Sequence, residues 1–404
     1  MRKIHYAWVV CAGCTLMLFM GSGISCNTLS AAYPYFRSIN GFSATEVSLL
    51  TTIRCLATLF GLFTVPLAAK RVDYRLPCAL SCVTDAISLY MYAFSTDIRV
   101  FYVASAILGF GLAYGFMLPV SVLIGRWFNA RRGTALGICS AVTGFTPMVF
   151  SPVLTAMIES RGLRFSLAAC ATLCLIAAIP VFFLIRPSPE SMGTTPFGEL
   201  PPETPQEQQR HGTKPNKAEW LLLLYAATVI GSIPIAYGMV TLLNTTAGLP
   251  AMPVSFAYSV ASAGLMGGKL LFGVISDRIG NRSTNMLFLG FALLGVALCC
   301  LANLCSVPLM FIGCLLTGLG TVTAAMTIST FAADFSTPQG FPEMMKRFQI
   351  AYHFGSLTTS LGMGMLADKT GSYIPGFLAF GVFLALGTAV VVYFYYRKKP
   401  LGSR

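Results

Sequence analysis

The chain has 404 residues, of which 55% are hydrophobic and 10% charged, and its mean hydropathy is +0.73. Soluble domains carry about 25% charged residues, so this composition excludes an ordinary soluble enzyme or binding domain. The formal net charge of +13 would fit a nucleic-acid partner, but the positions of the charges along the chain argue against one.

Polar stretches separate apolar runs of about 20 residues, the length of a helix that spans a hydrocarbon core of about 30 Å. Because backbone groups in lipid must be hydrogen-bonded internally, these runs predict helices rather than open sheet. Twelve such runs are expected, at 6–32, 46–69, 76–95, 98–124, 133–158, 165–185, 218–246, 253–275, 284–303, 306–333, 345–367 and 373–396. The sequence therefore predicts an all-α membrane protein with twelve transmembrane helices in two six-helix bundles.

The basic residues lie mostly on one side of these runs. With the N-terminus placed in the cytoplasm, 20 of the 27 Lys and Arg residues fall in inside segments and five in outside segments, while Arg54 and Lys269 lie within runs. This asymmetry follows the positive-inside rule, so both termini are expected in the cytoplasm. The net positive charge is thus explained by the orientation of the helices in the membrane, and no nucleic-acid partner is expected. The expected location is the cell inner (plasma) membrane.

One long polar stretch, residues 186–217, contains seven prolines together with several Glu and Gln residues. Its composition predicts a flexible cytoplasmic linker. Six runs precede it and six follow, so we expect an N-terminal bundle at 1–185 and a C-terminal bundle at 218–404. Two six-helix halves with a site at their interface near the membrane midplane are a known transporter plan.

Sites for enzymatic chemistry are missing from the sequence. It has no P-loop, no G-x-S-x-G elbow and no H-E-x-x-H zinc motif, and its three histidines are widely dispersed. Its thirteen cysteines, mostly in apolar runs, are interpreted as buried free thiols. We therefore expect no catalytic residue, metal or cofactor, and we expect a monomer.

Three charged residues lie well inside the apolar runs, away from their ends: Arg54, Asp85 and Lys269. Charged groups within membrane helices usually face a protein interior or a water-filled cavity and mark a functional site. No acidic residue shares the run of Lys269, which favours substrate binding over a structural ion pair there. Arg54 has two open interpretations, contact with the substrate and an ion pair with Asp85. Glycines such as Gly109 predict close helix contacts.

Three loop sequences carry a resemblance to a known family. GVISDRIGNR, after the eighth run, is similar to the loop motif G-x-x-x-D-R-x-G-x-R of the major facilitator superfamily. RWFNARRGTALGI, after the fourth run, resembles the loop of the monocarboxylate-transporter branch and its oxalate/formate-exchanger relatives. PLAAKRVDYR, after the second run, keeps Asp73 and basic neighbours but lacks the glycine pattern.

The resemblance implies roles for several side chains. Lys269 occupies the place, four residues before the motif glycine, where the family binds the substrate carboxylate, although several relatives have Arg there. Tyr114 matches a tyrosine whose hydroxyl contacts that carboxylate. His353 or its neighbour Tyr352 matches a lysine of the oxalate exchangers. Asn27 stands where the family has a lysine in the first helix.

Four loop residues are expected to control access to the site. Asp277 and Arg278 in the 8–9 loop would form a latch that holds the cytoplasmic side shut in one state. Arg131 and Arg132, at the start of the fifth run, have two open interpretations, a similar gate and charges that only fix topology.

Together these observations predict a secondary transporter of a small carboxylate anion, a monocarboxylate or a short dicarboxylate, working by alternating access. It would act as an exchanger or with a proton, so its partners are the anion, a proton or counter-anion, and the lipid bilayer. Two alternatives remain: a multidrug or cationic-substrate exporter, which needs a membrane-embedded carboxylate such as Asp85, and a non-transporting membrane sensor.

Overall fold

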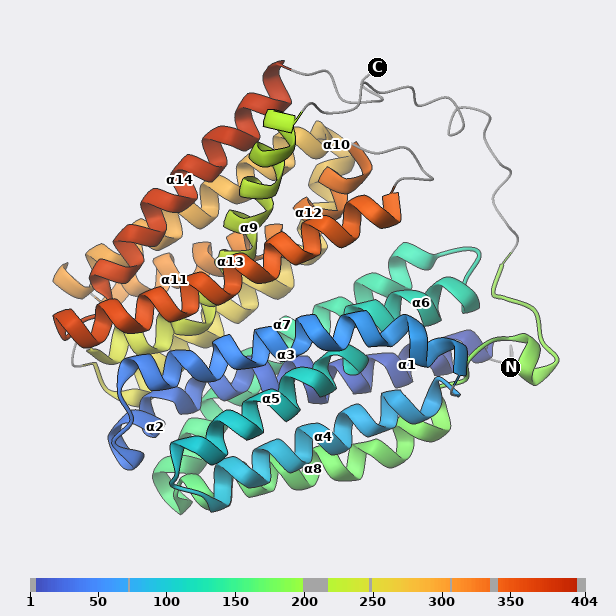
Figure 1. Cartoon of the computed structure of the whole chain (residues 1–404), viewed down its shortest axis with the longest axis horizontal. Helices are drawn as coiled ribbons and strands as arrows, with labels where there is room; N and C mark the ends of the chain where they lie inside the picture. The colour runs from blue at the N-terminus through green and yellow to red at the C-terminus, as the bar shows by residue number, and fades with distance from the viewer. Residues whose placement is uncertain are drawn as a thin grey trace. The chain divides into compact units, whose positions relative to one another are not determined.

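The computed structural model describes residues 5–71, 73–198, 217–246, 249–305, 307–334 and 341–397, and nearly all of them are helical (Figure 1). They form two compact units. Unit 1 comprises Met1–Pro201 with Ala251–Ser259, and unit 2 comprises Pro202–Pro250 with Val260–Arg404. The boundaries predicted from composition, at 1–185, 186–217 and 218–404, stay a prediction.

Unit 1 is built almost wholly from the first half of the chain. Its elements are α1 (Tyr6–Leu18), η1 (Phe19–Asn27), η2 (Thr28–Ala32), α2 (Tyr33–Asn40), α3 (Ala44–Arg71), α4 (Arg75–Phe94), α5 (Ile98–Gly115), α6 (Met117–Trp127), α7 (Arg132–Arg161), α8 (Leu163–Leu184) and the single turn η3 (Glu190–Met192). The most extensive packing joins α4 to α8 and α3 to α5.

Glycine permits the close approach of α3 and α5. A Cβ on Gly109 would overlap the carbonyl of Arg54, and one on Gly61 would lie 2.5 Å from the Cβ of Ala113. Thr58 fastens the same contact, because its hydroxyl lies 2.9 Å from the Arg54 carbonyl and 2.8 Å from the Gly109 carbonyl. Close backbone approach at small residues is typical of membrane helix pairs. The predicted role of Gly109 is thus observed.

The first membrane span is not a regular helix. Tyr6–Asn40 is continuous, but Phe19–Asn27 is π-helical and Thr28–Ala32 is 3₁₀-helical. The wide turn contains small residues, and a Cβ on Gly23 would lie 2.5 Å from the Thr146 hydroxyl of α7. Distorted turns of this kind are frequent at functional sites. The apolar run predicted at 6–32 therefore extends to Asn40 and has a distorted centre.

Unit 2 is also helical. Its elements are α9 (Lys217–Thr246), most of α10 (Ala251–Cys305), α11 (Val307–Thr321), α12 (Thr323–Asp334), α13 (Phe341–Thr370) and α14 (Ile374–Arg397). Gly280, with φ 81° and ψ 156°, divides α10 into two helical parts. The strongest packing joins α9 to α13, where glycines Gly231 and Gly355 lie directly against the facing backbone.

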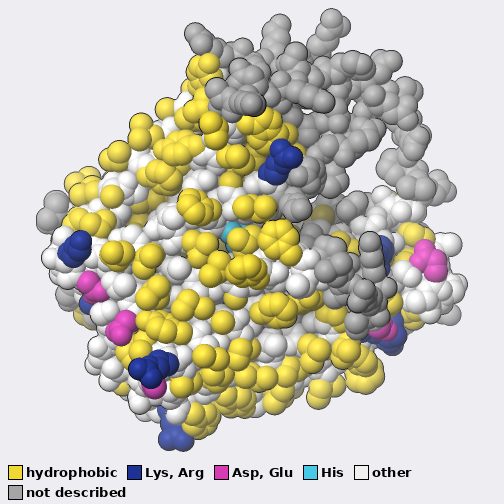
Figure 2. All heavy atoms as spheres, in the orientation of Figure 1, with side chains coloured by type: hydrophobic (Ala, Val, Ile, Leu, Met, Phe, Trp, Pro, Cys, Tyr) yellow, Lys and Arg dark blue, Asp and Glu magenta, His cyan; other side chains and the backbone are white. Residues whose placement is uncertain are grey.

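Among the described residues, eleven helical segments are long and apolar enough to cross a membrane. They account for every predicted run except 345–367, which falls on α13, a 30-residue helix with a more polar sequence. The face in Figure 2 is accordingly covered by hydrophobic side chains, with charged side chains few and mostly near its edges. The predicted helical membrane fold is confirmed.

The start of the linker is held on unit 1, where composition predicts flexibility. Phe197 N donates to the Trp127 carbonyl (2.8 Å), and the Trp127 indole donates to the Arg186 carbonyl (2.9 Å). The Phe197 ring packs against His5, Trp8 and Phe128, with ring centroids 5.4 to 5.9 Å away. Backbone pairing and aromatic packing thus order residues up to 198; residues 199–216 lie outside the described part.

Candidate functional site

In unit 1, Arg54 lies on α3 with its guanidinium directed at the end of the distorted first span. Its Nη1 donates to the Tyr33 hydroxyl (3.1 Å), which in turn lies 3.2 Å from the Thr51 hydroxyl. The Tyr33 hydroxyl, while it accepts from Arg54, keeps its own hydrogen, and either it or the Thr51 hydroxyl is the donor between the two. This relay fixes the guanidinium in one orientation while its other N–H groups form no hydrogen bond that the structure records.

Arg54 and Asp85 are not paired. The ion pair found among the described residues joins Asp73 to Arg75, and no contact links Arg54 to Asp85. Asp85 is 1% exposed, and its Oδ1 has no hydrogen-bond partner. Of the two interpretations of Arg54, the ion pair with Asp85 is absent from this structure.

Asn27 ends the π-helical turn. Its Nδ2 donates to the Thr143 carbonyl of α7 (2.9 Å), and its carbonyl accepts from the hydroxyl of Tyr258 (2.9 Å), in the part of α10 that belongs to unit 1. Its neighbour Cys26 lies close enough to Arg54 to interact with it electrostatically. Asn27 itself contacts Thr143 and Tyr258, and it lies one residue from a thiol within electrostatic range of Arg54.

Tyr114, on α5, lies at another depth of the α3–α5 interface. Its hydroxyl is 2.6 Å from that of Thr64, and Thr64 donates to the Gly61 carbonyl (2.6 Å). Because the Thr64 hydrogen is used there, Tyr114 is the donor of the pair. Ten residues of helix separate Thr64 from Arg54, or about 15 Å at 1.5 Å per residue. Tyr114 and Arg54 are thus not brought together in this conformation.

Lys269 belongs to unit 2. It lies half-buried in the first part of α10, a membrane-spanning segment that has no acidic residue from Ala251 to Ser276. Gly268 beside it fits closely against α11 and Val322, because a Cβ there would lie 2.8 Å from a Val322 methyl group. Close packing at Gly268 fixes the backbone that carries the lysine.

His353 and Tyr352 lie side by side on α13, with ring centroids 5.2 Å apart. His353 is 7% exposed, and its Nδ1 lies 2.8 Å from the Gln349 carbonyl. A ring nitrogen can bond to a carbonyl only by donating, so Nδ1 carries the hydrogen and Nε2 is the free acceptor of the neutral ring. Which of the two residues serves the site stays a prediction.

The predicted gate residues lie at helix ends. Arg131 is exposed and takes a left-handed conformation (φ 59°) just before α7, and Arg278 is exposed before the break at Gly280. The side chains of Arg132 and Asp277 lie outside the described part of the structure. Gating by these four residues stays a prediction.

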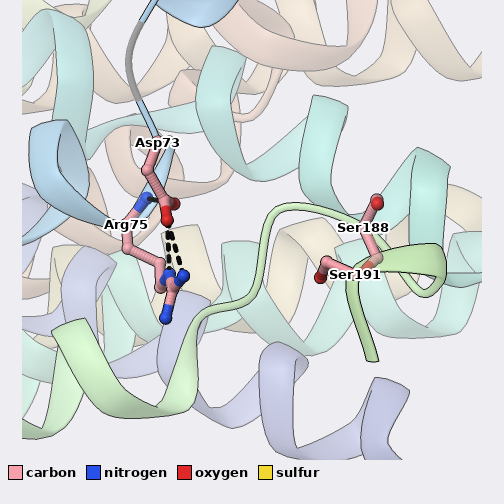
Figure 3. Close-up of polar contacts among 4 residues, drawn as sticks. All are labelled: Asp73, Arg75, Ser188 and Ser191. Atoms are coloured by element: carbon pink, nitrogen blue, oxygen red, sulfur yellow. Dashed lines mark hydrogen bonds and ion pairs between the residues drawn. The ribbon is translucent and has the colours of Figure 1, made fainter. Parts of the chain in front are cut away.

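The 2–3 loop shows a local use of the motif aspartate that it keeps. Asp73 accepts from Arg75 Nε (2.8 Å) and from the Arg75 backbone N–H (3.0 Å) at the start of α4 (Figure 3). The Arg75 guanidinium lowers the pKa of Asp73 by this hydrogen bond. Figure 3 also shows Ser188 and Ser191, which lie at the single turn η3 after α8. The Ser191 hydroxyl donates to the Ser188 carbonyl (2.6 Å).

No sequence motif singles out Tyr33, Thr51 or Cys26. Nothing local marks them, because their relation to Arg54 depends on how the distorted first span folds against α3. The small residues Gly21, Ser22, Gly23 and Ser25 were the available signal for that distortion.

The helices and their membrane-spanning lengths define a polytopic membrane protein with two helical units. The family model described as Major Facilitator Superfamily matches residues 12–341 and 268–404, so this chain belongs to that superfamily. The predicted family and fold are confirmed.

Similar proteins refine the placement within the superfamily. The chain is 26% identical over 326 residues to monocarboxylate transporter 13 of Bos taurus, covering 77% of the chain and 71% of that protein. It is 22% identical over 419 residues to monocarboxylate transporter 12 of Rattus norvegicus, covering 93% and 82%. The solved nucleoside transporter NupG shares the fold, with a TM-score of 0.71 at 14% identity over 98% of this chain and all of that one. The chain is therefore a multi-pass membrane transporter that resembles the monocarboxylate-transporter branch.

Proposed function

We propose that this protein is a secondary transporter of small organic carboxylate anions, monocarboxylates or short dicarboxylates, that works by alternating access. The observation that carries the proposal is Arg54. A guanidinium within a membrane-spanning helix is costly unless something compensates its charge. Arg54 has no carboxylate partner among the described residues, and its recorded side-chain hydrogen bond goes to neutral Tyr33. An anionic substrate would supply the missing charge.

Each unit carries a membrane-embedded cation among its described residues, Arg54 in unit 1 and Lys269 in unit 2. The planar guanidinium suits two-point binding of a carboxylate, whereas the lysine ammonium acts as a point charge with three donors. In the proposed mechanism Lys269 binds the substrate carboxylate and Arg54, oriented by Tyr33, binds a second carboxylate or polar group. Tyr114, Asn27 and His353 or Tyr352 complete the recognition.

The named relatives support a carboxylate substrate, because those with the broadest matches carry the name monocarboxylate transporter. Exchange and proton coupling are both compatible with the site, and His353 offers a titratable group for the second. We place the protein as a monomer in the inner (plasma) membrane with both termini in the cytoplasm. Arg131, Arg132, Asp277 and Arg278 would control the cytoplasmic opening.

A cationic-substrate exporter is the competing class. It would need an accessible carboxylate in the membrane, and the internal acid Asp85 is 1% exposed. That burial argues against direct contact between Asp85 and a substrate, so the anion transporter is favoured.

The test is uptake of radiolabelled lactate, pyruvate, formate and oxalate into proteoliposomes, with and without the unlabelled anion inside. We expect at least one of them to enter by protein-dependent transport. Uptake only into preloaded vesicles would identify an exchanger, and uptake into empty vesicles would identify symport or uniport. Transport of none of them would reject the proposal.

Two variants and a control connect transport to the site. Lys269→Ala and Arg54→Ala should abolish uptake, while the variant proteins still purify as folded species. Arg99→Ala removes the same charge from an exposed position at the start of α5 and should transport normally. Full uptake by Lys269→Ala would show that the carboxylate is bound elsewhere.

A further inference from the structure

A second charged group in unit 1 has no role in the site described so far. Asp85 lies in the middle of α4 and is buried to 1% exposure, with Oδ1 lacking any hydrogen-bond partner. No Lys, Arg or His of the described residues forms an ion pair with it. An ionised carboxylate in such surroundings loses its hydration and gains nothing in return, so the neutral, protonated acid is strongly favoured.

The groups that face Asp85 are consistent with a neutral acid. α8 contributes the Cys174 thiol, and Cys82 lies near it on α4 itself. The titratable groups described on the other packed elements lie against other partners. On η1, Cys26 is near Arg54; on α5, Tyr114 bonds to Thr64, Tyr102 is near Glu46 and Arg99 is exposed. On α1, Cys14 is near Cys78, Cys11 lies 3.6 Å from Cys139 and the Tyr6 hydroxyl donates to the Phe183 carbonyl. No described cation is therefore placed to hold a negative charge at Asp85.

Asp85 also touches the distorted turn that leads to the substrate site. A Cβ on Gly21, in η1, would lie 3.2 Å from Asp85 Oδ2 and 3.7 Å from the Gly115 carbonyl at the end of α5. Five residues further along the same π-helical turn, Cys26 lies within electrostatic range of Arg54. One continuous irregular segment thus carries both residues, Gly21 next to the Asp85 carboxyl and Cys26 within electrostatic range of the guanidinium.

We propose that Asp85 is a proton-binding site that keeps the π-helical turn of the first span in place beside Arg54. The reaction is the simple equilibrium of a carboxyl with a proton, in which the O–H bond forms or breaks and no other bond changes. Loss of the proton leaves a charge in an apolar contact. The contact between α4 and η1 must then open to admit water, and this displaces the segment that reaches Arg54.

The consequence for transport rests on the proposed function. Transport falls as pH rises through the titration of Asp85, because the protonated form is the one in which η1 is closed on α4. Asp85→Asn has nearly the same shape and cannot ionise. It should therefore keep transport at high pH, where the wild type has lost most of its activity.

The first measurement needs no substrate. Infrared spectroscopy of the purified full-length protein at neutral pH should show the carbonyl stretch of a protonated carboxylic acid. That band should be missing from Asp85→Asn and unchanged in Asp97→Asn, a matched change at an exposed residue that precedes α5. An Asp85 that is ionised at neutral pH, with no such band, overturns the proposal.

The second measurement is the pH profile of exchange in proteoliposomes, with equal pH on both sides and an anion fully ionised over the whole range. We expect a declining alkaline limb in the wild type and Asp97→Asn, and a flat profile in Asp85→Asn. An unchanged limb in Asp85→Asn overturns the proposed control of transport, as does a limb lost only in His353→Gln.

Gly21→Ala provides a variant that keeps the acid. Its added methyl group presses on Asp85 Oδ2, so the infrared band should shift in frequency and the alkaline limb should move. A band and a limb identical to those of the wild type would contradict the contact. If no carboxylate is transported at all, the proposed function fails, but the infrared result still tests the proton site.

Discussion

Tyr33 is the residue on which the orientation of Arg54 depends. The guanidinium uses one N–H group to hold the phenol, and the phenol is held by Thr51, so the remaining N–H groups point in a fixed direction. A prearranged guanidinium loses less side-chain freedom when it binds an anion. The affinity for the anion should therefore depend on the uncharged side chain of Tyr33.

We expect Tyr33→Phe to weaken transport affinity without abolishing transport. A typical hydrogen bond contributes about 0.5–1.5 kcal/mol, which corresponds to a rise in KM of about two- to tenfold. The measurement is the concentration dependence of uptake. Tyr35→Phe is the control, because the Tyr35 hydroxyl bonds to exposed Glu159 instead. A KM equal to that of the wild type would mean that Tyr33 does not orient Arg54.

For single residues, the sequence identifies the charges but not their partners. Arg54 and Lys269 were recognisable because a charge in an apolar run is a local anomaly. The pair between Arg54 and Asp85 remained open because a hydropathy pattern does not say which face of a helix meets which neighbour. In the structure Arg54 faces Tyr33 of α2, whereas Asp85 faces Gly21 and α8, so each charge has its own surroundings.

Among the elements, α3 and α5 show how a helix pair supports the site. Gly109 allows the α5 backbone to touch the carbonyl of Arg54, the residue that carries the functional side chain. Any side chain at 109 must separate the two helices where their geometry matters most. The same glycine therefore contributes to stability and to the position of the guanidinium.

Gly109→Ala should lower both thermal stability and transport. Overpacking of a well-packed interface typically costs about 1–3 kcal/mol. Gly137→Ala in α7 is the matched control, since a Cβ there meets nothing within 4 Å and alanine favours the helix. Thermal unfolding in detergent and uptake in vesicles measure the two effects. Equal melting temperatures for the two variants would contradict the close packing.

Helix positions were predictable and helix distortions were not. A hydrocarbon core imposes the length of each apolar run, so observed bounds such as Ala44–Arg71 lie within a few residues of the prediction at 46–69. The π-helical turn from Phe19 to Asn27 lies inside the apolar run predicted at 6–32, and its small residues do not by themselves fix the type of helix. It depends on tertiary contacts such as Gly23 against Thr146, which no periodicity reports.

For the whole molecule, the distribution of basic residues makes a prediction about orientation. Both termini should lie in the cytoplasm, because that placement puts most Lys and Arg residues on the inside. An epitope tag at either end should be detected only after the membrane is permeabilised. A tag inserted at Ser95–Asp97, between α4 and α5, should be detected on intact cells. Detection of a terminal tag on intact cells would reverse the topology.

The linker between the two halves shows what amino-acid composition alone does not predict. Proline, Glu and Gln predict an unstructured segment when nothing contacts it. Residues 186–198 are instead held by Trp127 at the end of α6 and by Phe128 directly after it. A single aromatic residue changes the average composition of a polar stretch very little. The contacts of Phe197 nevertheless hold the residues around it in place.

The aromatic contacts of Phe197 also set an order of events during biosynthesis. Trp8, Phe128 and Phe197 are translated in that order, and they come together at one place on unit 1. The last of them follows all six membrane spans of the first half, so those spans can be inserted while the cluster is still incomplete. Domains fold as units from the N-terminus as the chain emerges. Unit 1 therefore reaches its finished packing only after the ribosome has read into the linker, and a chain released at residue 185 would leave Trp8 and Phe128 without their final partner.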